Sequence, residues 1–515
     1  MSRPAHHDTT PMDGVVGARS SGRAVSFGRR ITDLAAADPQ RPAVTCGPTG
    51  LTRAELEAAA NRLARRLSTV GVTVGSMVTI ALPNSLEFIV AMVAAWKLGA
   101  IPQPVSPRLP LRELRSVIEL AESPVVLGLD RGMEGTSLGE GRSVLPIEEL
   151  WPSGLSDEPL EDAVSPAWKA PTSGGSTGTP KLIVSGDAGL IKPDGPRPLL
   201  LDPDDSLVMP GPLYHNGPLV WTCQALLWGA HVVLLQRFDP EATLAAIAEH
   251  RAEVVYLVPT MMKRIWRLPE QVREGFDLSC LRVVWHLAEP CPPWLKQAWI
   301  DWLGPDRIIE LYAGTEGQVA TVITGTEWLA HRGSVGRPIN GDISICDAEG
   351  NELPPRAEGE VWLRGRRKSP TYHYVGASPR RREGGWESLG DCGWLDDDGY
   401  LYLGDRMLDM ILTGGANVYP AEVEAAINEH PAVQSCAVIG LPDEDRGHIV
   451  HAIVEASPDR VSPHDLNGFL AERLVAYKLP RSIEFVDEPL RDEAGKVRRS
   501  QLRAERIGRE RPAPS

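Results

Sequence analysis

The sequence has few cysteines and lacks any long hydrophobic run. Its seven cysteines are scattered, odd in number and never spaced as CxxC, which argues against a disulfide framework or a zinc site. The longest apolar stretch, residues 88–96, is too short to span a membrane. The sequence therefore predicts a cytoplasmic protein with no membrane partner.

Positive charge is also scarce. The 53 lysines and arginines face 68 aspartates and glutamates, which gives a formal net charge of −15. A surface this acidic repels a phosphate backbone, so nucleic-acid binding is excluded as the main activity. A small nucleotide is still allowed, because a local site holds it and a metal ion usually accompanies it.

An export signal is missing as well. Arg29 and Arg30 form the pair that begins a twin-arginine signal, but Asp33 and Asp38 occupy the stretch where such a signal needs an apolar core. Residues 1–27 are therefore predicted to be a flexible N-terminal tail, not a targeting segment.

Alternating helical and strand-like patterns predict an α/β fold. We expect a large N-terminal domain of mixed or parallel sheets flanked by helices, and a smaller C-terminal α/β domain. At roughly 100–200 residues per domain, 515 residues require at least two domains. The predicted boundaries are residues 28–405 for the large domain, 406–505 for the small domain and 506–515 for a frayed tail.

A glycine-rich loop, PTSGGSTGTPK at 171–181, has the composition of a phosphate-binding loop. Glycines let backbone N–H groups surround an anion, while hydroxyl groups and Lys181 neutralise it. A Walker A loop does not fit, because Thr179 and Pro180 separate Gly178 from the lysine. A serine-hydrolase elbow centred on Ser176 fits the letters G-x-S-x-G, but it must lead straight into a helix, and a strand-like KLIV follows. A flexible linker would need neither the lysine nor the strand.

This loop resembles the phosphate loop of the AMP-forming adenylating enzymes, which include acyl- and aryl-CoA synthetases, luciferases and nonribosomal adenylation domains. Four further motifs follow in family order, and the resemblance extends over residues 28–505. Two other segments, PLYHNGP and HLAEPCPPW, are most similar to bile-acid and aryl-acid CoA ligases. The four motifs are LYAGTEG (311–317), GDCGWLDDDGYLYLGDR (390–406), GGANVYPAEVE (414–424) and EAGKVRRSQL (493–502).

The resemblance implies Mg-ATP as a substrate. Tyr312 would stack on adenine, Thr315 would contact the α-phosphate, Glu316 would bind Mg²⁺, and Asp391 would accept hydrogen bonds from the ribose hydroxyls. The implied ATP site comprises Thr172, Ser173, Gly174, Ser176, Thr177, Gly178, Lys181, Tyr312, Ala313, Thr315, Asp391, Arg406 and Lys496.

The resemblance also implies that the small domain is mobile and carries the catalytic Lys496. A long cation there would bridge the α-phosphate and the attacking carboxylate oxygen as negative charge gathers. Gly414 and Gly415 would line a tunnel for the pantetheine arm of coenzyme A. At the hinge the sequence departs from the usual pattern, because Leu408 stands where many members have Asp or Lys.

The predicted acyl pocket combines residues from several motifs. His215 would gate the pocket and take part in catalysis, while Glu289 either lies at the adenine pocket or holds an amine. These alternatives stay open at the level of sequence. The implied substrate-binding residues are His215, Trp221, Tyr256, Pro259, Glu289 and Gly314.

The sequence thus predicts an AMP-forming acid–CoA ligase that uses ATP, Mg²⁺ and coenzyme A on a ring-bearing or aryl acid, as a monomer or homodimer. One alternative is an ATP-dependent diazotase that activates nitrite and transfers it to an aromatic amine. Another is a serine hydrolase using Ser176. An inactive binding module is disfavoured, because the motif residues are all present, namely Lys181, Glu316, Asp391, Arg406 and Lys496.

Overall fold

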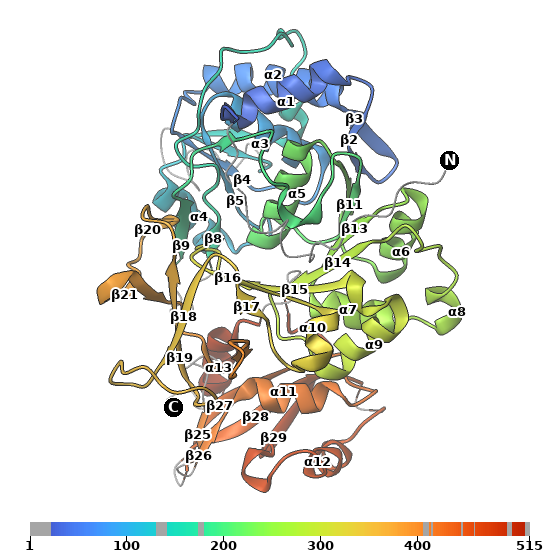
Figure 1. Ribbon diagram of the computed structural model, residues 1–515, viewed down its shortest axis with the longest axis vertical. Coiled ribbons are helices and arrows are strands. Elements are labelled where there is room, and N and C mark those ends of the chain that lie inside the picture. Colours follow the sequence, from blue (N-terminus) through green and yellow to red (C-terminus); the bar gives the residue numbers. More distant parts are fainter. Residues whose placement is uncertain are drawn as a thin grey trace, which may run out of the picture.

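Figure 1 shows the computed structural model of the chain, with the large domain above and the small domain below. It describes residues 22–129, 142–173, 180–404, 411–413, 416–443, 446–457, 459–491 and 497–509. None of the helices in these ranges is both long and apolar enough to cross a membrane. The α/β class and the division into a large and a small domain agree with the sequence-based expectation.

A nine-stranded sheet forms the centre of the large domain, in the order β17-β16-β15-β14-β13-β11-β12-β2-β3. The six strands from β2 to β15 in this order are parallel, and antiparallel strands flank them at both edges. The strand bounds are β2 (Pro42–Cys46), β3 (Thr49–Thr52), β11 (Ser206–Met209), β12 (His231–Leu234), β13 (Val254–Leu257), β14 (Val283–Leu287), β15 (Ile308–Ala313), β16 (Ala320–Thr324) and β17 (Arg337–Pro338).

Helices connect these parallel strands because crossovers between parallel neighbours need a dozen or more residues. Strands β13 and β14 are buried along their whole length, in keeping with their mainly apolar sequences, and His286 of β14 is a buried polar exception. The connecting helices are α5 (Asn216–Trp228), α6 (Pro240–Glu249), α7 (Pro259–Trp266), the short α8 (Glu270–Arg273) and α9 (Pro293–Leu303), and α10 (Gly325–Ala330) follows β16.

A second, parallel sheet has the order β5-β4-β6-β7 and packs around helix α3. This helix is apolar on every side, and residues 88–97 are buried, so it lies inside the domain. Helix α2 begins with a capping box between Thr52 and Glu55. The bounds are α1 (Phe27–Ala37), α2 (Arg53–Thr69), β4 (Met77–Ile80), α3 (Leu86–Lys97), β5 (Ile101–Pro104), α4 (Leu111–Ala121), β6 (Val125–Leu127) and β7 (Ser143–Leu145).

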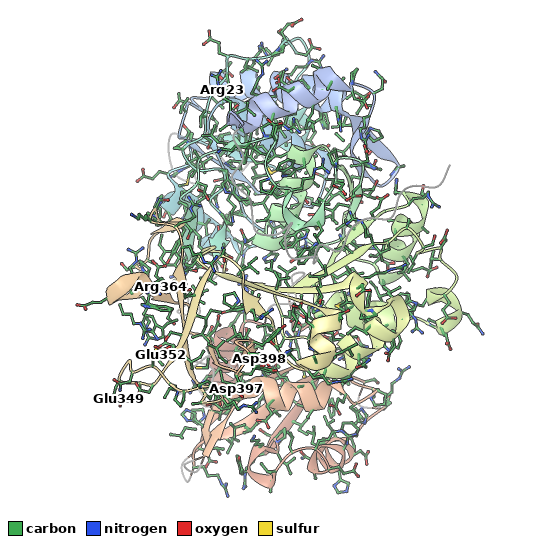
Figure 2. The ribbon with its side chains drawn as sticks, viewed as in Figure 1. Arg23, Glu349, Glu352, Arg364, Asp397 and Asp398 are labelled. Carbon is green, nitrogen blue, oxygen red and sulfur yellow. The ribbon has the colours of Figure 1, made fainter. Side chains whose placement is uncertain are left out.

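Two antiparallel sheets complete the large domain. The three-stranded sheet, β20-β9-β8, consists of β8 (Thr172–Ser173), β9 (Lys181–Ser185) and β20 (Tyr372–Val375). In the six-stranded sheet, exposed charged residues such as Glu349, Glu352 and Asp397 lie in the loops between strands (Figure 2). Its strands are β18 (Gly341–Cys346), β19 (Gly359–Gly365), β21 (Arg380–Arg382), β22 (Trp386–Ser388), β23 (Cys392–Leu395) and β24 (Leu401–Leu403).

The small domain has its own sheet and apolar core. It contacts the large domain through Lys263 of α7, whose Nζ donates to Asn428 Oδ1 at 2.7 Å, and through Arg498, which lies 3.3 Å from Glu113 of α4. Its elements are β25 (Ile411–Thr413), β26 (Ala416–Val418), α11 (Pro420–Asn428), β27 (Ser435–Asp443), β28 (Gly447–Glu455), α12 (Pro463–Ala471), β29 (Ser482–Val486) and α13 (Arg499–Arg509).

Ordered structure extends into both predicted tails. Strand β1 (Val25–Ser26) pairs with β10 (Leu190–Ile191), and α1 begins at Phe27, which is buried. At the other end, helix α13 continues to residue 509. Its Arg506 is held there because Nε donates to Glu484 Oε2 at 2.6 Å.

Candidate active site

The topology brings four predicted site segments to one edge of the central sheet. Parallel strands present their carboxyl ends at the same edge, where ligands of open α/β sheets usually bind. His215 follows β11, Pro259 follows β13, Glu289 follows β14, and Glu316 follows β15. Residues far apart in the sequence therefore converge at this edge.

The turn after β15 is shaped by Gly314 and Gly317. A Cβ on Gly314 would lie 2.4 Å from Leu389 Cδ1 and 2.9 Å from Glu316 Oε2, so a larger residue would displace both side chains. Gly317 has a φ of +66°, and its N–H donates to the Gly314 carbonyl at 3.0 Å. This tight turn presents Thr315 and Glu316 directly beyond the strand.

Glu316 is a buried carboxylate at the centre of a polar cluster. Tyr374 donates its hydroxyl proton to Glu316 Oε1 at 2.6 Å, and Lys181 Nζ lies 3.7 Å from the same oxygen. Lys181 Nζ also lies 3.9 Å from the centre of the Tyr374 ring. Burial, and then the bond to Glu316, raise the pKa of Tyr374, so the tyrosine stays a neutral donor. The cluster offers a carboxylate for a hard cation beside an ammonium for phosphate.

Tyr312 and Asp391 form a second pair. The Tyr312 hydroxyl donates to Asp391 Oδ2 at 2.7 Å, which joins the end of β15 to the loop before β23. Both residues are partly exposed, so the ring and the carboxylate remain accessible. This is an arrangement that could hold a nucleoside, with a ring face for the base and a carboxylate for ribose hydroxyls.

Two aromatic residues predicted for the acyl pocket are packed against each other, Trp221 on α5 and Tyr256 on β13. Trp221 contacts the ring of Tyr256 with centroids 5.3 Å apart, and both residues are almost completely buried. Tyr256 reaches the start of α5, where a Cβ on Gly217 would lie 2.3 Å from its hydroxyl oxygen. His215 precedes α5 and contacts the Tyr214 ring at 4.8 Å. In this structure Trp221 and Tyr256 belong to the core, and their lining of a pocket stays a prediction.

Glu289 has a structural role that the sequence did not indicate. Its Oε2 accepts from the backbone N–H of Thr260 at 3.0 Å and from the Thr260 hydroxyl at 2.8 Å. Thr260 is the second residue of α7, so the carboxylate caps the N-terminus of that helix. The cap ties the end of β14 to the start of α7 at Pro259, which is buried.

Several predicted residues lie outside the described part of the chain. Thr172 and Lys181 are described, and Ser173 pairs with Lys181 across the β8–β9 ladder at the base of the glycine-rich loop. The residues outside are Gly174, Ser176, Thr177, Gly178, Arg406, Leu408, Gly414, Gly415 and Lys496.

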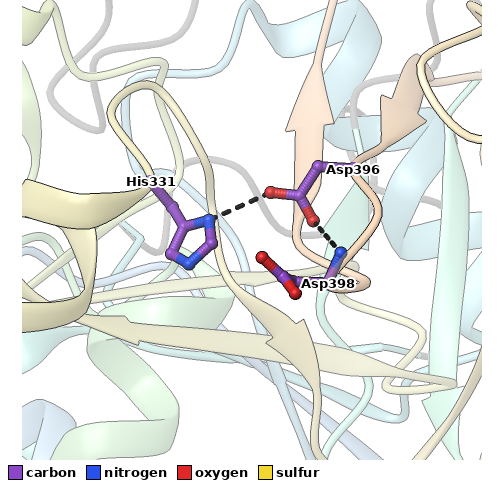
Figure 3. Close-up of side chains that lie close together, drawn as sticks. All are labelled: His331, Asp396 and Asp398. Carbon is purple, nitrogen blue, oxygen red and sulfur yellow. Dashed lines mark hydrogen bonds and ion pairs between the residues drawn. The ribbon is translucent and has the colours of Figure 1, made fainter.

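One further polar cluster was not predicted. His331 Nδ1 lies 3.0 Å from Asp396 Oδ2, and the backbone N–H of Asp398 donates to Asp396 Oδ1 at 3.0 Å (Figure 3). Tyr400 and Tyr402 also donate to Asp396, so its two oxygens close the turn between β23 and β24. These contacts explain the cluster as a structural turn.

Two family models match the chain. Residues 31–373 match the model described as AMP-binding enzyme, and residues 422–496 match the AMP-binding enzyme C-terminal domain. The chain therefore belongs to the AMP-binding enzyme family.

Curated relatives and solved structures support this assignment. The chain is 31% identical to a feruloyl-CoA synthase of Amycolatopsis sp. over 482 residues, 90% of this chain and 96% of the relative. It is 30% identical to the 2-succinylbenzoate–CoA ligase of Bacillus licheniformis over 477 residues, 90% and 97% of the two chains.

Among solved structures, the o-succinylbenzoate CoA synthetase of Bacillus subtilis is similar in two states. The complex with its acyl-adenylate has a TM-score of 0.77 at 25% identity and covers 93% of this chain and 98% of that one. The complex with ATP and magnesium ion has a TM-score of 0.76 at 26% identity, with 93% and 100% covered. These relatives are acid–CoA ligases, and they give no support to the diazotase or the serine hydrolase.

Proposed function

We propose that the protein is a Mg-ATP-dependent, AMP-forming acid–CoA ligase whose substrate is a ring-bearing carboxylic acid. The observation that carries this proposal is the convergence of Lys181, Glu316 and Tyr374 beside the Tyr312–Asp391 pair. A carboxylate oxygen attacks the α-phosphorus of ATP and expels pyrophosphate. The sulfur of coenzyme A then attacks the acyl carbon and releases AMP.

Each part of ATP has a proposed partner in the chain. Glu316 binds Mg²⁺ and Lys181 binds the outer phosphates, a division supported by their 3.7 Å separation. Tyr312 stacks on adenine, and Asp391 accepts from the ribose. The remaining proposed contacts come from Thr172, Ser173, Gly174, Ser176, Thr177, Gly178, Ala313, Thr315 and Arg406.

The small domain supplies the catalytic lysine and the acceptor channel. Lys496 neutralises charge where the acid meets the α-phosphate. In support, Arg491 and Val497 on either side of Lys496 form an antiparallel β-bridge. Arg498, two residues after Lys496, forms an ion pair with Glu113 of the large domain. Gly414 and Gly415 admit the pantetheine arm of coenzyme A.

The acid binds near the start of α5. Support comes from His215 at the helix start and from the packed pair of Trp221 on the same helix and Tyr256 on β13. Both curated relatives described above carry names of acids with an aromatic ring, feruloyl and 2-succinylbenzoate. We also place the enzyme in the cytoplasm, where all seven cysteines, free in this structure, would stay reduced.

An ATP–pyrophosphate exchange screen tests the proposal. The acids are ferulate, 2-succinylbenzoate, anthranilate and a straight-chain fatty acid, with nitrite plus an aminoaryl acid as a separate arm. We expect exchange with at least one aromatic acid, and formation of its CoA thioester when coenzyme A is added. AMP release that requires nitrite and the amine, and that does not depend on coenzyme A, would overturn the proposal.

A further inference from the structure

Lys169 lies on the same sheet face as the predicted phosphate-binding Lys181. The backbone N–H of Ser185 donates to the Lys169 carbonyl at 3.0 Å, which continues the antiparallel pairing of β8 with β9. Lys169 is therefore the cross-strand neighbour of Ser185. Because strand side chains alternate with a period of two, residues 169 and 181 project from one face, together with Tyr374 of β20.

The opposite face of this sheet is the apolar one. Ala170, Leu182 and Val184 pack there against the buried residues of α4. The face that carries the two lysines is the polar one, where Lys181 meets Glu316. Ser185, the cross-strand neighbour of Lys169, is four residues from Lys181 along β9, which corresponds to about 13 Å between the two lysine positions.

The ammonium of Lys169 is buried and has a neutral hydrogen-bond partner. The residue is only 7% exposed, and its Nζ donates to Oδ1 of Asn216, the first residue of α5. In the described part of the chain, no carboxylate lies within ion-pair distance of Lys169. Burial lowers the pKa of Lys169 to about 8, and Cys223, Glu316 and Asp187 act in the opposite direction through weaker electrostatic effects.

A buried ammonium without a counter-ion reduces the stability of a fold. The helix start makes this worse, because the first turn of α5 carries partial positive charge from its free N–H groups. Stability alone would favour an apolar residue here. Two sources of positive charge thus converge at one buried point, and together they fit an anionic group of a ligand.

We propose that Lys169 is a further substrate-binding residue whose ammonium recognises the carboxylate of the acid at the start of α5. Asn216 holds the ammonium in position until the acid arrives. This inference rests on the proposed function, because it assigns Lys169 to the acid of that reaction. The acid is favoured over ATP because the ammonium of Lys169 contacts Asn216, the residue that directly follows His215, whereas Lys181 lies beside Glu316.

The Lys169→Met variant tests the assignment, because methionine keeps the length and removes the charge. We expect a higher apo Tm, since an uncompensated buried charge is gone. In pyrophosphate exchange with ferulate or 2-succinylbenzoate, we expect the KM for the acid to rise on the order of 10- to 100-fold, the range for one charged hydrogen bond. Calorimetry should find the Kd for Mg-ATP changed by less than about twofold.

Two variants serve as controls. Lys97 at the end of α3 is also buried, but its Nζ lies 2.7 Å from Oε2 of Glu57 on α2. Lys97→Met should therefore lower the Tm and leave the KM for the acid unchanged. Asn216→Asp gives Lys169 a carboxylate partner within the chain. It should maintain or raise the apo Tm and still raise the KM for the acid, because the new carboxylate competes with the substrate.

Two outcomes would contradict the inference itself, and a third would contradict the proposed function on which it rests. A lower Tm for Lys169→Met with an unchanged KM for the acid makes Lys169 structural. Weaker Mg-ATP binding with an unchanged KM for the acid assigns the ammonium to phosphate. If the wild-type protein shows no exchange with either acid, the ring-bearing acid of the proposed function fails first. If the wild-type enzyme is active and Lys169→Met has the same KM for the acid, the inference fails and the proposed function stands.

Discussion

At the scale of single residues, the chemistry of the site depends on which charges are paired. Glu316 has a tyrosine hydroxyl and a lysine as neighbours, which hold its carboxylate in one orientation. Among the described residues, the ammonium of Lys169 contacts only neutral groups, the amide of Asn216 and the ring of Trp168, whose centre lies 4.9 Å from Nζ. The two residues therefore behave differently when their charge is removed.

Glu316→Gln should leave the apo Tm nearly unchanged, because an amide oxygen can still accept from Tyr374. It should reduce the rise in Tm that Mg-ATP produces, since a neutral ligand binds Mg²⁺ less well and stabilisation by a ligand follows its affinity. Thermal unfolding with and without Mg-ATP measures both effects. Tyr374→Phe is the control for loss of the hydrogen bond alone. A large fall in apo Tm for Glu316→Gln would make Glu316 a structural residue.

The pH dependence of stability should reveal the buried Lys169. Its pKa in the folded protein is about 8, below the ordinary lysine value of 10.5, so the charged form destabilises the fold. Between these two values the unfolded chain binds more protons, and stability rises with pH. Relative to Lys169→Met, the wild type should be less stable by about 3 kcal/mol below pH 8, and the difference should vanish near pH 10.5. Urea unfolding of both proteins across this range measures it, and a constant difference would contradict the expectation.

At the scale of secondary-structure elements, the carboxyl edge of the central sheet is organised by how helices begin. Helix α7 starts at Pro259 and has no cap from its own N-cap residue, Val258. Glu289, at the end of the neighbouring strand, supplies that cap through Thr260. The capping contact fixes two of the segments predicted to surround the acyl pocket.

Glu289→Ala should reduce the free energy of unfolding by about 1 kcal/mol, the usual value of a lost N-cap. Glu289→Gln should lose less, because its amide oxygen can still accept from Thr260. Chemical unfolding compares the three proteins. If Glu289→Ala keeps full stability but loses affinity for the acid or for an amine, Glu289 is a substrate-binding residue and its contact with Thr260 is secondary.

At the scale of the whole molecule, the reaction requires the small domain to act in two ways. The structure describes one arrangement of the domains, in which Lys263 contacts Asn428 and Arg498 contacts Glu113. In the proposed mechanism Lys496 takes part in adenylate formation, and coenzyme A enters past Gly414 and Gly415 in the second step. The two half-reactions should therefore respond differently to changes in the small domain.

Lys496→Ala should slow adenylate formation by about 100-fold, because an ionic contact made mainly in the transition state is worth about 3 kcal/mol. Thioester formation from a supplied acyl-adenylate should be nearly unaffected. Single-turnover measurements of each half-reaction make the comparison. An equal loss in both would contradict a role for Lys496 confined to the first step.

The family, the α/β class and the motif residues could all be predicted from the sequence alone. The reason is that the glycine-rich loop and the segments around Glu316 and Asp391 are short and contiguous. Their chemistry can therefore be inferred from residues that are neighbours in the sequence. The alternation of apolar patterns likewise predicted the buried helix α3 and the strand that follows Lys181.

Which of these residues contact one another could not be predicted in this way, because it depends on the three-dimensional packing. Tyr374 donates to Glu316 from 58 residues away, and Glu289 caps a helix that begins 30 positions earlier. Lys169 lies in a short, otherwise apolar stretch where nothing local marks it as buried beside α5. Contacts of this kind arise from sheet register and the packing of helices on strands, which bring distant residues together and which a local pattern does not encode.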